Sequence, residues 1–197
     1  APTIKDLTAR IQYLEAELRQ QRRYHDITRT LFSISNAISA TGTLDELYRS
    51  IHLSLGAIID TRNFYIALHH PEKDSVTFPY CVDSVDECYP PVLGISDTES
   101  LTADVIRTGR PLFILKDEIV QRRGSSACHI PACTPAEVWL GVPLKTRAGI
   151  LGVMAVQSYT DANQYDQTDL DVMVSVAGQV AAAIEHKRAE QELRYSQ

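Results

Sequence analysis

The chain has 197 residues, of which 44% are hydrophobic, and a formal net charge of −6. This length can bury one sizeable core, so we expect a single globular domain with extensions. Four cysteines are too few for a disulfide scaffold, and the sequence contains neither a signal peptide nor an apolar run of about 18 residues, which predicts a cytoplasmic location and reduced thiols. The start at Ala1 and the helical composition at the end indicate a piece of a longer polypeptide.

The charge is unevenly distributed along the chain. Residues 1–38 hold six basic and four acidic groups, and residues 184–197 hold three of each, which leaves −8 for the middle. A protein that reads nucleic acid needs a basic patch, so we expect no nucleic-acid partner and no membrane contact. The basic side chains of Arg19, Arg22 and Arg23 are interpreted as a solvated helix face.

The N-terminal segment carries a narrow heptad seam. Apolar residues recur there at alternating spacings of three and four, at Ile4, Leu7, Ile11, Leu14 and Leu18. Gln21 and Arg22 interrupt the seam, and the series resumes one residue out of phase at Tyr24, Ile27, Leu31, Ile34 and Ile38. A seam of two positions in seven predicts a partner helix, most simply the same helix of a second copy in a parallel homodimer. The alternative is a helix that lies on its own domain.

A second helix and a strand hairpin are predicted to follow. Thr43 stands three residues before Glu46, which is the capping-box signature of a helix start. Residues 63–70 and 75–83 have strand composition around a short turn. Because proline cannot donate to a strand ladder, Pro79 predicts an edge or a bulge in the second strand.

The middle of the chain predicts shorter elements. Residues 84–100 are polar and proline-bearing, which indicates irregular structure. Ser100 can cap a short helix that runs to Arg107, and residues 111–115 form a short strand. No period holds over residues 116–137, so this span is predicted to be a loop.

The C-terminal third predicts a second hairpin and a long helix. Residues 138–159 form two apolar runs around a turn, and both strands are expected to be buried on both faces. Asp166, three residues before Asp169, can cap a long helix whose apolar side ends at Ile184. This order of elements predicts an α+β domain with a mostly antiparallel sheet, helices on one face and loops on the other, flanked by N- and C-terminal helices.

The residues that carry these elements resemble a GAF domain over residues 24 to 190. The matching motifs, in their expected order, are NFYIAL, FPYCVD, LTADVIRTGRP, WLGVPL, GILGVMAVQSY and the closing YDQTDLDVMVSVAGQVAAAIEHKRAEQEL. The resemblance implies a regulatory sensor of a bacterial signalling protein, placed before a PAS domain, histidine kinase or diguanylate cyclase. We therefore divide the chain into a signalling helix (1–23), a sensor domain (24–184) and a linker helix (185–197) toward an output domain.

GAF domains differ in what they bind, and two ligand classes can be compared with this sequence. The residue set of cyclic-nucleotide-binding relatives has no traceable match. Bilin-binding relatives attach the chromophore through a Cys-His pair that resembles Cys128-His129. They hold that cysteine on a helix, whereas Pro131 and Pro135 oppose a helix here, so we expect no bilin.

The loop around Cys128 also raises the question of a metal site. Cys128, His129 and Cys133 are soft ligands, but a closed zinc site needs a fourth, which only Cys81 or Cys88 can supply. A catalytic dyad of Cys128 and His129 is disfavoured because neighbouring side chains on an extended chain point to opposite sides. We interpret the loop as a surface covering with incidental thiols and expect neither zinc nor another cofactor; a redox role of these cysteines is left open.

The resemblance implies a pocket beneath the long loops 84–100 and 116–137. The candidate ligand-binding residues are Tyr65, Tyr80, Asp83, Thr102, Trp139 and Gln157. Each has another explanation: Tyr80 and Trp139 as core residues, and Asp83 as a turn cap. No phosphate loop, paired catalytic acids or oriented nucleophile is present, so we expect no enzyme activity from this fragment. Two hypotheses follow: a sensor that binds a small molecule, or a ligand-free dimerisation and relay module.

Overall fold

The computed structural model describes residues 3–125 and 134–195. Five helices are described: α1 (Ile4–Ala40), α2 (Leu44–Leu55), α3 (Leu101–Thr108), α4 (Lys116–Ser125) and α5 (Gln167–Tyr195). Six strands are described: β1 (Phe64–His70), β2 (Ser75–Val82), β3 (Val92–Leu93), β4 (Leu112–Leu115), β5 (Val138–Thr146) and β6 (Gly149–Ser158). Two short 3-10 turns, Pro71–Lys73 and Ile95–Asp97, complete the order.

The six strands form one sheet in the order β3-β2-β1-β6-β5-β4, and every neighbouring pair is antiparallel. The predicted fold class and both hairpins are therefore confirmed. The β1–β2 register shifts between Ile66 and Leu68, opposite Pro79, so the predicted bulge is confirmed as well. β5 and β6 lie inside the sheet and are buried along most of their length, as their apolar runs predict.

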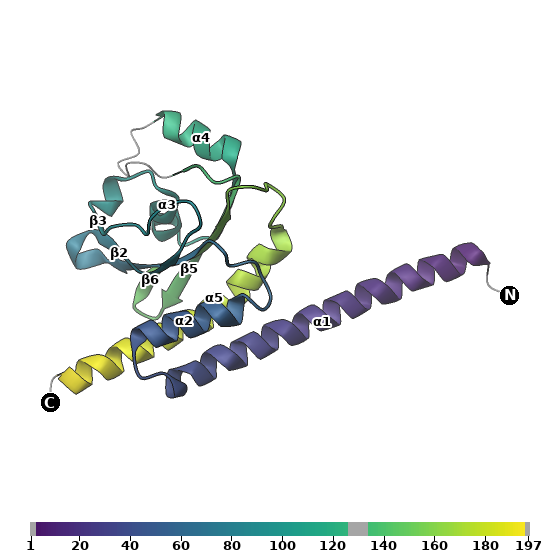
Figure 1. Ribbon diagram of the computed structural model, residues 1–197, viewed down its shortest axis with the longest axis horizontal. Coiled ribbons are helices and arrows are strands. Elements are labelled where there is room, and N and C mark those ends of the chain that lie inside the picture. The colour runs from purple at the N-terminus through teal and green to yellow at the C-terminus, as the bar shows by residue number, and fades with distance from the viewer. Residues whose placement is uncertain (1–2, 126–133, 196–197) are drawn as a thin grey trace.

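Both faces of the sheet are covered (Figure 1). The helices α1, α2 and α5 lie on one side and enclose the larger core, in which Leu140 and Met154 meet Met173 of α5. The second core lies on the other face, where Ala103 of α3 and Ile119 of α4 pack on the strands beside the connecting loops. The prediction of loops alone on this face was incomplete, because α3 and α4 cover part of it.

Local sequence explains where most helices begin and end. Thr43 and Glu46 form both hydrogen bonds of the predicted capping box at the start of α2. Ser100 caps α3, and Gly109 ends it in the left-handed conformation that glycine adopts without strain. Asp166 accepts hydrogen bonds from the first backbone N–H groups of α5. The helix α4 was wrongly predicted to be a loop.

The long helices α1 and α5 run side by side in the same direction (Figure 1). Three polar contacts join them at a nearly constant sequence offset: Arg23 to Asp169, Gln179 to Ser35, and Lys187 to the carbonyl oxygen of Thr41. Since this offset stays between 144 and 146 residues, the two helices are parallel and in register. The helices continue without a break through the predicted domain boundaries near 23 and 184.

The two apolar stripes of α1 have different surroundings. In the second stripe, Ile34 is fully buried and Leu31 packs against the larger core. The first stripe, from Ile4 to Leu18, is exposed in this chain, with relative exposures between 42% and 84%. Every described side chain before Arg23 is exposed, because this part of α1 extends beyond the domain (Figure 1).

None of the helices in the described ranges combines the length and the apolar character that a bilayer crossing requires.

Candidate functional site

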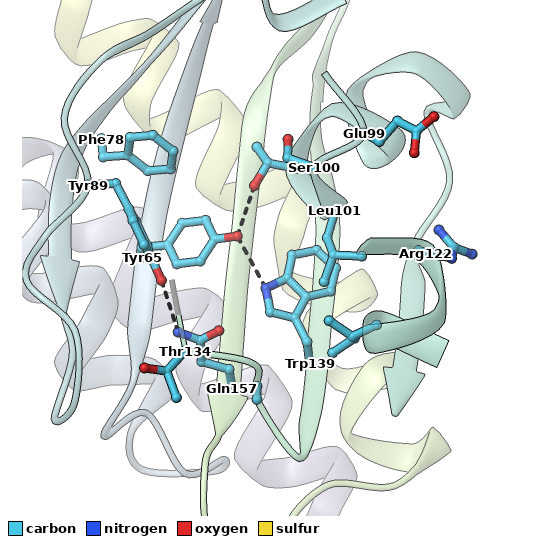
Figure 2. Close-up of a pocket in the computed structure, with 13 residues that line it drawn as sticks. Tyr65, Phe78, Tyr89, Glu99, Ser100, Leu101, Arg122, Thr134, Trp139 and Gln157 are labelled. Carbon is cyan, nitrogen blue, oxygen red and sulfur yellow. Dashed lines mark hydrogen bonds between the residues drawn. The ribbon is translucent and has the colours of Figure 1, made fainter. Parts of the chain in front are cut away.

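A cavity of about 80 Å³ lies between the sheet and the helices α3 and α4 (Figure 2). Aromatic side chains form much of its wall, and a few polar groups interrupt them. The lining residues are Tyr65, Phe78, Tyr89, Glu99, Ser100, Leu101, Thr102, Ile119, Arg122, Thr134, Ala136, Trp139 and Gln157. A concave, mostly apolar site with a few polar groups is the usual form of a small-molecule site.

Strand register brings the wall residues together. Trp139 on β5 pairs directly with Gln157 on β6, so both side chains point to the same face of the sheet. Tyr65 on β1 lies on this face as well, in van der Waals reach of Phe78 and Tyr89. The ring pairs among these three residues have centroids 5.2 to 5.8 Å apart and none is stacked face to face.

A short line of hydrogen bonds fixes the rings at the centre of the wall. The indole Nε1 of Trp139 donates to the hydroxyl of Tyr65 at 3.2 Å, and that hydroxyl lies 2.9 Å from the hydroxyl of Thr102 on α3 (Figure 2). Trp139 is only 2% exposed, and its polar N–H is therefore satisfied inside the protein. The cavity wall is held in place before any ligand arrives.

The amide of Gln157 forms a second polar group in the wall. Its Nε2 donates to a carboxylate oxygen of Asp83 at 2.8 Å and to the hydroxyl of Tyr159 at 2.7 Å, and it lies 3.3 Å from the hydroxyl of Tyr89. The Tyr159 hydroxyl donates in turn to the same Asp83 oxygen. Burial, followed by the neighbouring Tyr89 and Asp83, raises the pKa of Tyr159, so this phenol stays protonated at neutral pH.

The edge of the cavity is held by acidic groups. Both carboxylate oxygens of Asp86 bind Thr134, one at its backbone N–H and one at its hydroxyl, each at 2.8 Å. Arg122 of α4 donates to Asp104 of α3 at 2.6 Å, which joins the two helices over the cavity. Glu99 is exposed at the rim.

Four of the six predicted site residues line this cavity: Tyr65, Thr102, Trp139 and Gln157. Asp83 lies directly behind the wall, where it binds Gln157 and also accepts from the backbone N–H groups of Val85 and Asp86, as a turn cap does. Whether any of these residues touches a ligand stays a prediction.

The structure corrects the position of Tyr80. Its ring packs on the opposite face of the sheet beside Phe64, and its hydroxyl lies 2.8 Å from Nδ1 of His52. The bulge at Pro79 explains the error, because one extra residue exchanges the two faces of a strand. Phe78, before the bulge, therefore occupies the cavity wall in place of Tyr80.

Sequence reasoning missed several lining residues. Tyr89 lies in the span predicted to be irregular, where no periodicity assigns a face, although an aromatic residue in a polar segment was a usable indication. Ile119 and Arg122 lie on α4, which was predicted to be a loop. Both were out of reach without knowing that this helix exists.

The cysteine-rich loop of the sequence falls outside the described residues. Cys128, His129 and Cys133 therefore have no structural account, and the predictions of no zinc and no bilin there stay predictions. Within residues 3–125 and 134–195, no group of three or more His, Cys, Asp or Glu is arranged to hold a metal ion. Of the other two cysteines, Cys88 donates its thiol hydrogen to the carbonyl oxygen of Cys81 at 3.2 Å.

Comparison with known proteins agrees with this architecture. The family model described as GAF domain matches residues 41–185, which is more than half of the sequence. The chain therefore belongs to the GAF domain family. No curated protein matches it significantly.

Solved structures of this fold are similar in shape and distant in sequence. The GAF domain of an Acinetobacter phosphoenolpyruvate-protein phosphotransferase has a TM-score of 0.61 at 16% identity, over 82% of this chain and 94% of that one. The GAF domain of A. aeolicus nlh2 in an inactive state has a TM-score of 0.62 at 12% identity, over 83% of this chain and 98% of that one. Free methionine-R-sulfoxide reductase from Neisseria meningitidis, in complex with its substrate, has a TM-score of 0.63 at 14% identity, over 83% of this chain and 91% of that one. At these identities the likeness concerns the fold alone.

Gly141 is expected to be essential to the cavity wall. A Cβ at this position would lie 2.0 Å from Cη2 of Trp139, so Gly141→Ala must displace the indole. We expect a loss of about 1–3 kcal/mol in the free energy of unfolding, measured by urea denaturation. Gly178→Ala is the matched control: no atom lies within 4 Å of the new Cβ, and alanine in a helix gains up to about 1 kcal/mol over glycine. Equal effects of both changes would contradict this account of Trp139.

Alkaline pH is expected to destabilise the fold through buried tyrosines. Burial raises the pKa of Tyr48 to about 12, whereas the same phenol in the unfolded chain ionises near about 10. The stabilisation that the protonated Tyr48 phenol gives the folded state is therefore complete below pH ~10. As the pH rises from there toward 12, the free energy of unfolding falls by about 1.4 kcal/mol for each pH unit. Urea unfolding at pH 9 and 11 should show a drop that Tyr48→Phe reduces by about this amount. An unchanged drop in the variant would mean that Tyr48 ionises equally in both states.

Proposed function

We propose that this GAF domain is a regulatory sensor that binds a small molecule in the cavity beneath α3 and α4. The observation that carries the proposal is the wall itself, in which Trp139, Tyr65 and Thr102 are fixed by mutual hydrogen bonds around an open space. Such preorganisation lowers the ordering cost of binding, because the side chains are already immobile. A reductase of the same fold has been solved in complex with its substrate, which supports the proposal that this fold can hold a small molecule.

We further propose that ligand binding is relayed through α1 and α5 of a homodimer. The parallel register of these helices gives a continuous path from the N-terminal seam to the C-terminal end, and the two termini leave at opposite ends of the domain (Figure 1). Lys187 joins α5 to the C-terminal end of α1, since its buried ammonium group donates both to the carbonyl oxygen of Thr41 and to Glu190. A ligand can shift these helices from one arrangement to another only if it binds the two arrangements with different affinity.

The setting of the domain follows from the same proposal. We infer a cytoplasmic, bacterial, multi-domain signalling protein, of the two-component or cyclic-di-nucleotide type, in which α5 leads to a PAS, histidine kinase or diguanylate cyclase domain. We also infer that this domain is not itself catalytic and contacts neither nucleic acid nor membrane. Burial and the neighbouring thiol of Cys88 raise the pKa of Cys81, which opposes the thiolate that a nucleophile needs.

The alternative is a ligand-free module that only dimerises and relays. The sequence contains a single tryptophan, and it lies in the cavity wall, so intrinsic fluorescence reports directly on this site. A library of small metabolites should contain a compound that shifts both the Trp139 emission and the melting temperature, because a ligand that binds the native state alone stabilises it by mass action. If a broad library changes neither quantity, the ligand-free alternative holds.

A further inference from the structure

Hydrogen-bond acceptors, and carboxylates that have no ion-pair partner in the described part of the chain, lie around the cavity. Among the described residues, Asp83, Asp86 and Glu99 form no ion pair, and each lies in the wall or one contact behind it. Arg122 is the cation in the described wall, and it is engaged by Asp104, which also pairs with Arg107. In Figure 2 the guanidinium of Arg122 points away from the ring of Trp139.

Gln157 presents to the cavity an amide oxygen that has no hydrogen-bond donor among the described residues. The residue is only 4% exposed, and its Nε2 is held toward the Asp83 carboxylate, which accepts hydrogen bonds and cannot donate one. The amide oxygen is therefore turned to the opposite side, where it receives no hydrogen bond from a described residue (Figure 2). A carbonyl oxygen at the cavity that has no donor among the described residues favours a ligand that brings one.

The apolar wall has the character that weakly hydrated cations prefer. Four aromatic rings, from Tyr65, Phe78, Tyr89 and Trp139, line one small space. Because the ring pairs meet at 57° to 80°, no ring covers the face of another in a parallel stack. Aromatic faces carry negative potential, and clusters of them bind alkylated ammonium groups.

The geometry points to a small organic cation, an amine or alkylated ammonium compound with an apolar body, as the ligand of this cavity. The inference rests on the proposed function of the cavity as a ligand site and adds the chemical class. The ammonium group lies against the rings near Gln157, and the carboxylates of Asp83 and Asp86 behind the wall lower its energy. The same carboxylates repel an anion of the same size.

The class is tested with pairs of compounds that share a shape and differ in charge. Choline is compared with its neutral carbon isostere 3,3-dimethylbutan-1-ol, and 2-phenylethylamine with 2-phenylethanol and phenylacetate. Binding is followed by Trp139 emission and by calorimetry. We expect one of the cations to bind about tenfold more tightly than its neutral partner. The inference is overturned if each cation binds only as tightly as its neutral partner, or if phenylacetate binds more tightly than 2-phenylethylamine.

The outcomes separate this inference from the proposed function. A neutral or anionic library compound that binds at Trp139, while none of the cations does, overturns the ligand class and leaves the sensor function standing. No response to compounds of any charge overturns both.

A variant pair connects the charge preference to particular residues. In Asp83→Asn the new amide favours rotation of the Gln157 amide, which turns an N–H donor into the cavity. We expect cation affinity to fall about tenfold while binding of the neutral partner is unchanged. Glu72→Gln removes an exposed carboxylate on the 3-10 turn after β1 and is expected to change neither.

A second variant covers the case in which Asp83→Asn fails to fold. Glu99→Gln changes an exposed rim residue, so folding is unaffected, and cation affinity should fall about twofold. Equal loss of cation and neutral binding in the folded variants contradicts the inference, because a merely structural role lowers both.

Discussion

Removal of residues 1–22 is expected to convert this chain from a dimer into a monomer while its GAF fold stays intact. Every described side chain before Arg23 is exposed, including the five apolar residues of the seam. Each such side chain contributes on the order of 1.5–3 kcal/mol when it is fully buried. The domain keeps its own packing, because the second stripe of α1, around Ile34, remains in the larger core. Sedimentation of both forms at tens of micromolar measures the difference.

A single substitution should have a similar effect on dimerisation. Leu14→Asp places two carboxylates in a twofold-related seam, so we expect the dissociation constant to rise on the order of 10³-fold. Leu53→Asp is the matched control, since Leu53 is exposed on α2 and lies outside the seam. A wild-type chain that sediments as a monomer, or equal dissociation by both variants, would remove the dimer hypothesis.

Cross-linking distinguishes the two possible directions of pairing. In a parallel dimer each seam residue faces its own copy, so Leu14→Cys should form an intermolecular disulfide with itself. An antiparallel dimer would instead cross-link a mixture of Ile4→Cys and Leu18→Cys chains. Parallel pairing is expected because it keeps both α5 exits on the same side, where two copies of an output domain can meet.

The fold was accessible from sequence wherever local pattern and long-range packing agree. The capping box of Thr43 and Glu46, the Ser100 cap and the apolar runs of β5 and β6 each determine structure within a few residues. Such features can be predicted from one sequence because their stability depends on residues that are close along the chain.

The errors lie where a tertiary contact decides the local structure. The helix α4 has a single buried hydrophobic residue in its described side chains, Ile119, so no apolar period marks it, and its contact with Asp104 through Arg122 is invisible to periodicity. Of the predicted site residues, Trp139 on β5 and Gln157 on β6 line the cavity, where strand alternation is regular. Tyr80 lies on the opposite face, because the position of a bulge decides which face a side chain takes, and Pro79 alone does not show which residue of the strand is the extra one.

The bulge leads to the second large prediction, which contrasts Trp139→Ala with Tyr80→Ala. Both changes remove an aromatic ring from a packed cluster, so both should destabilise the fold: by about 3–5 kcal/mol for the fully buried Trp139 and by less for the half-buried Tyr80. Urea denaturation measures these costs. Only Trp139 lines the cavity, whereas Tyr80 packs on the far side of the sheet against His52 and Phe64.

Ligand affinity, measured in the folded variants, should therefore separate the two residues. Calorimetry with the compound that shifts Trp139 emission most in the wild type should show at least about tenfold weaker binding for Trp139→Ala, because a wall ring and the anchor of Tyr65 are both lost. Tyr80→Ala should bind with wild-type affinity despite its lower stability. If Tyr80→Ala weakens binding as much as Trp139→Ala does, the effect of Trp139 is not specific to the cavity, and the cavity between the sheet and α3 is not the sensor site.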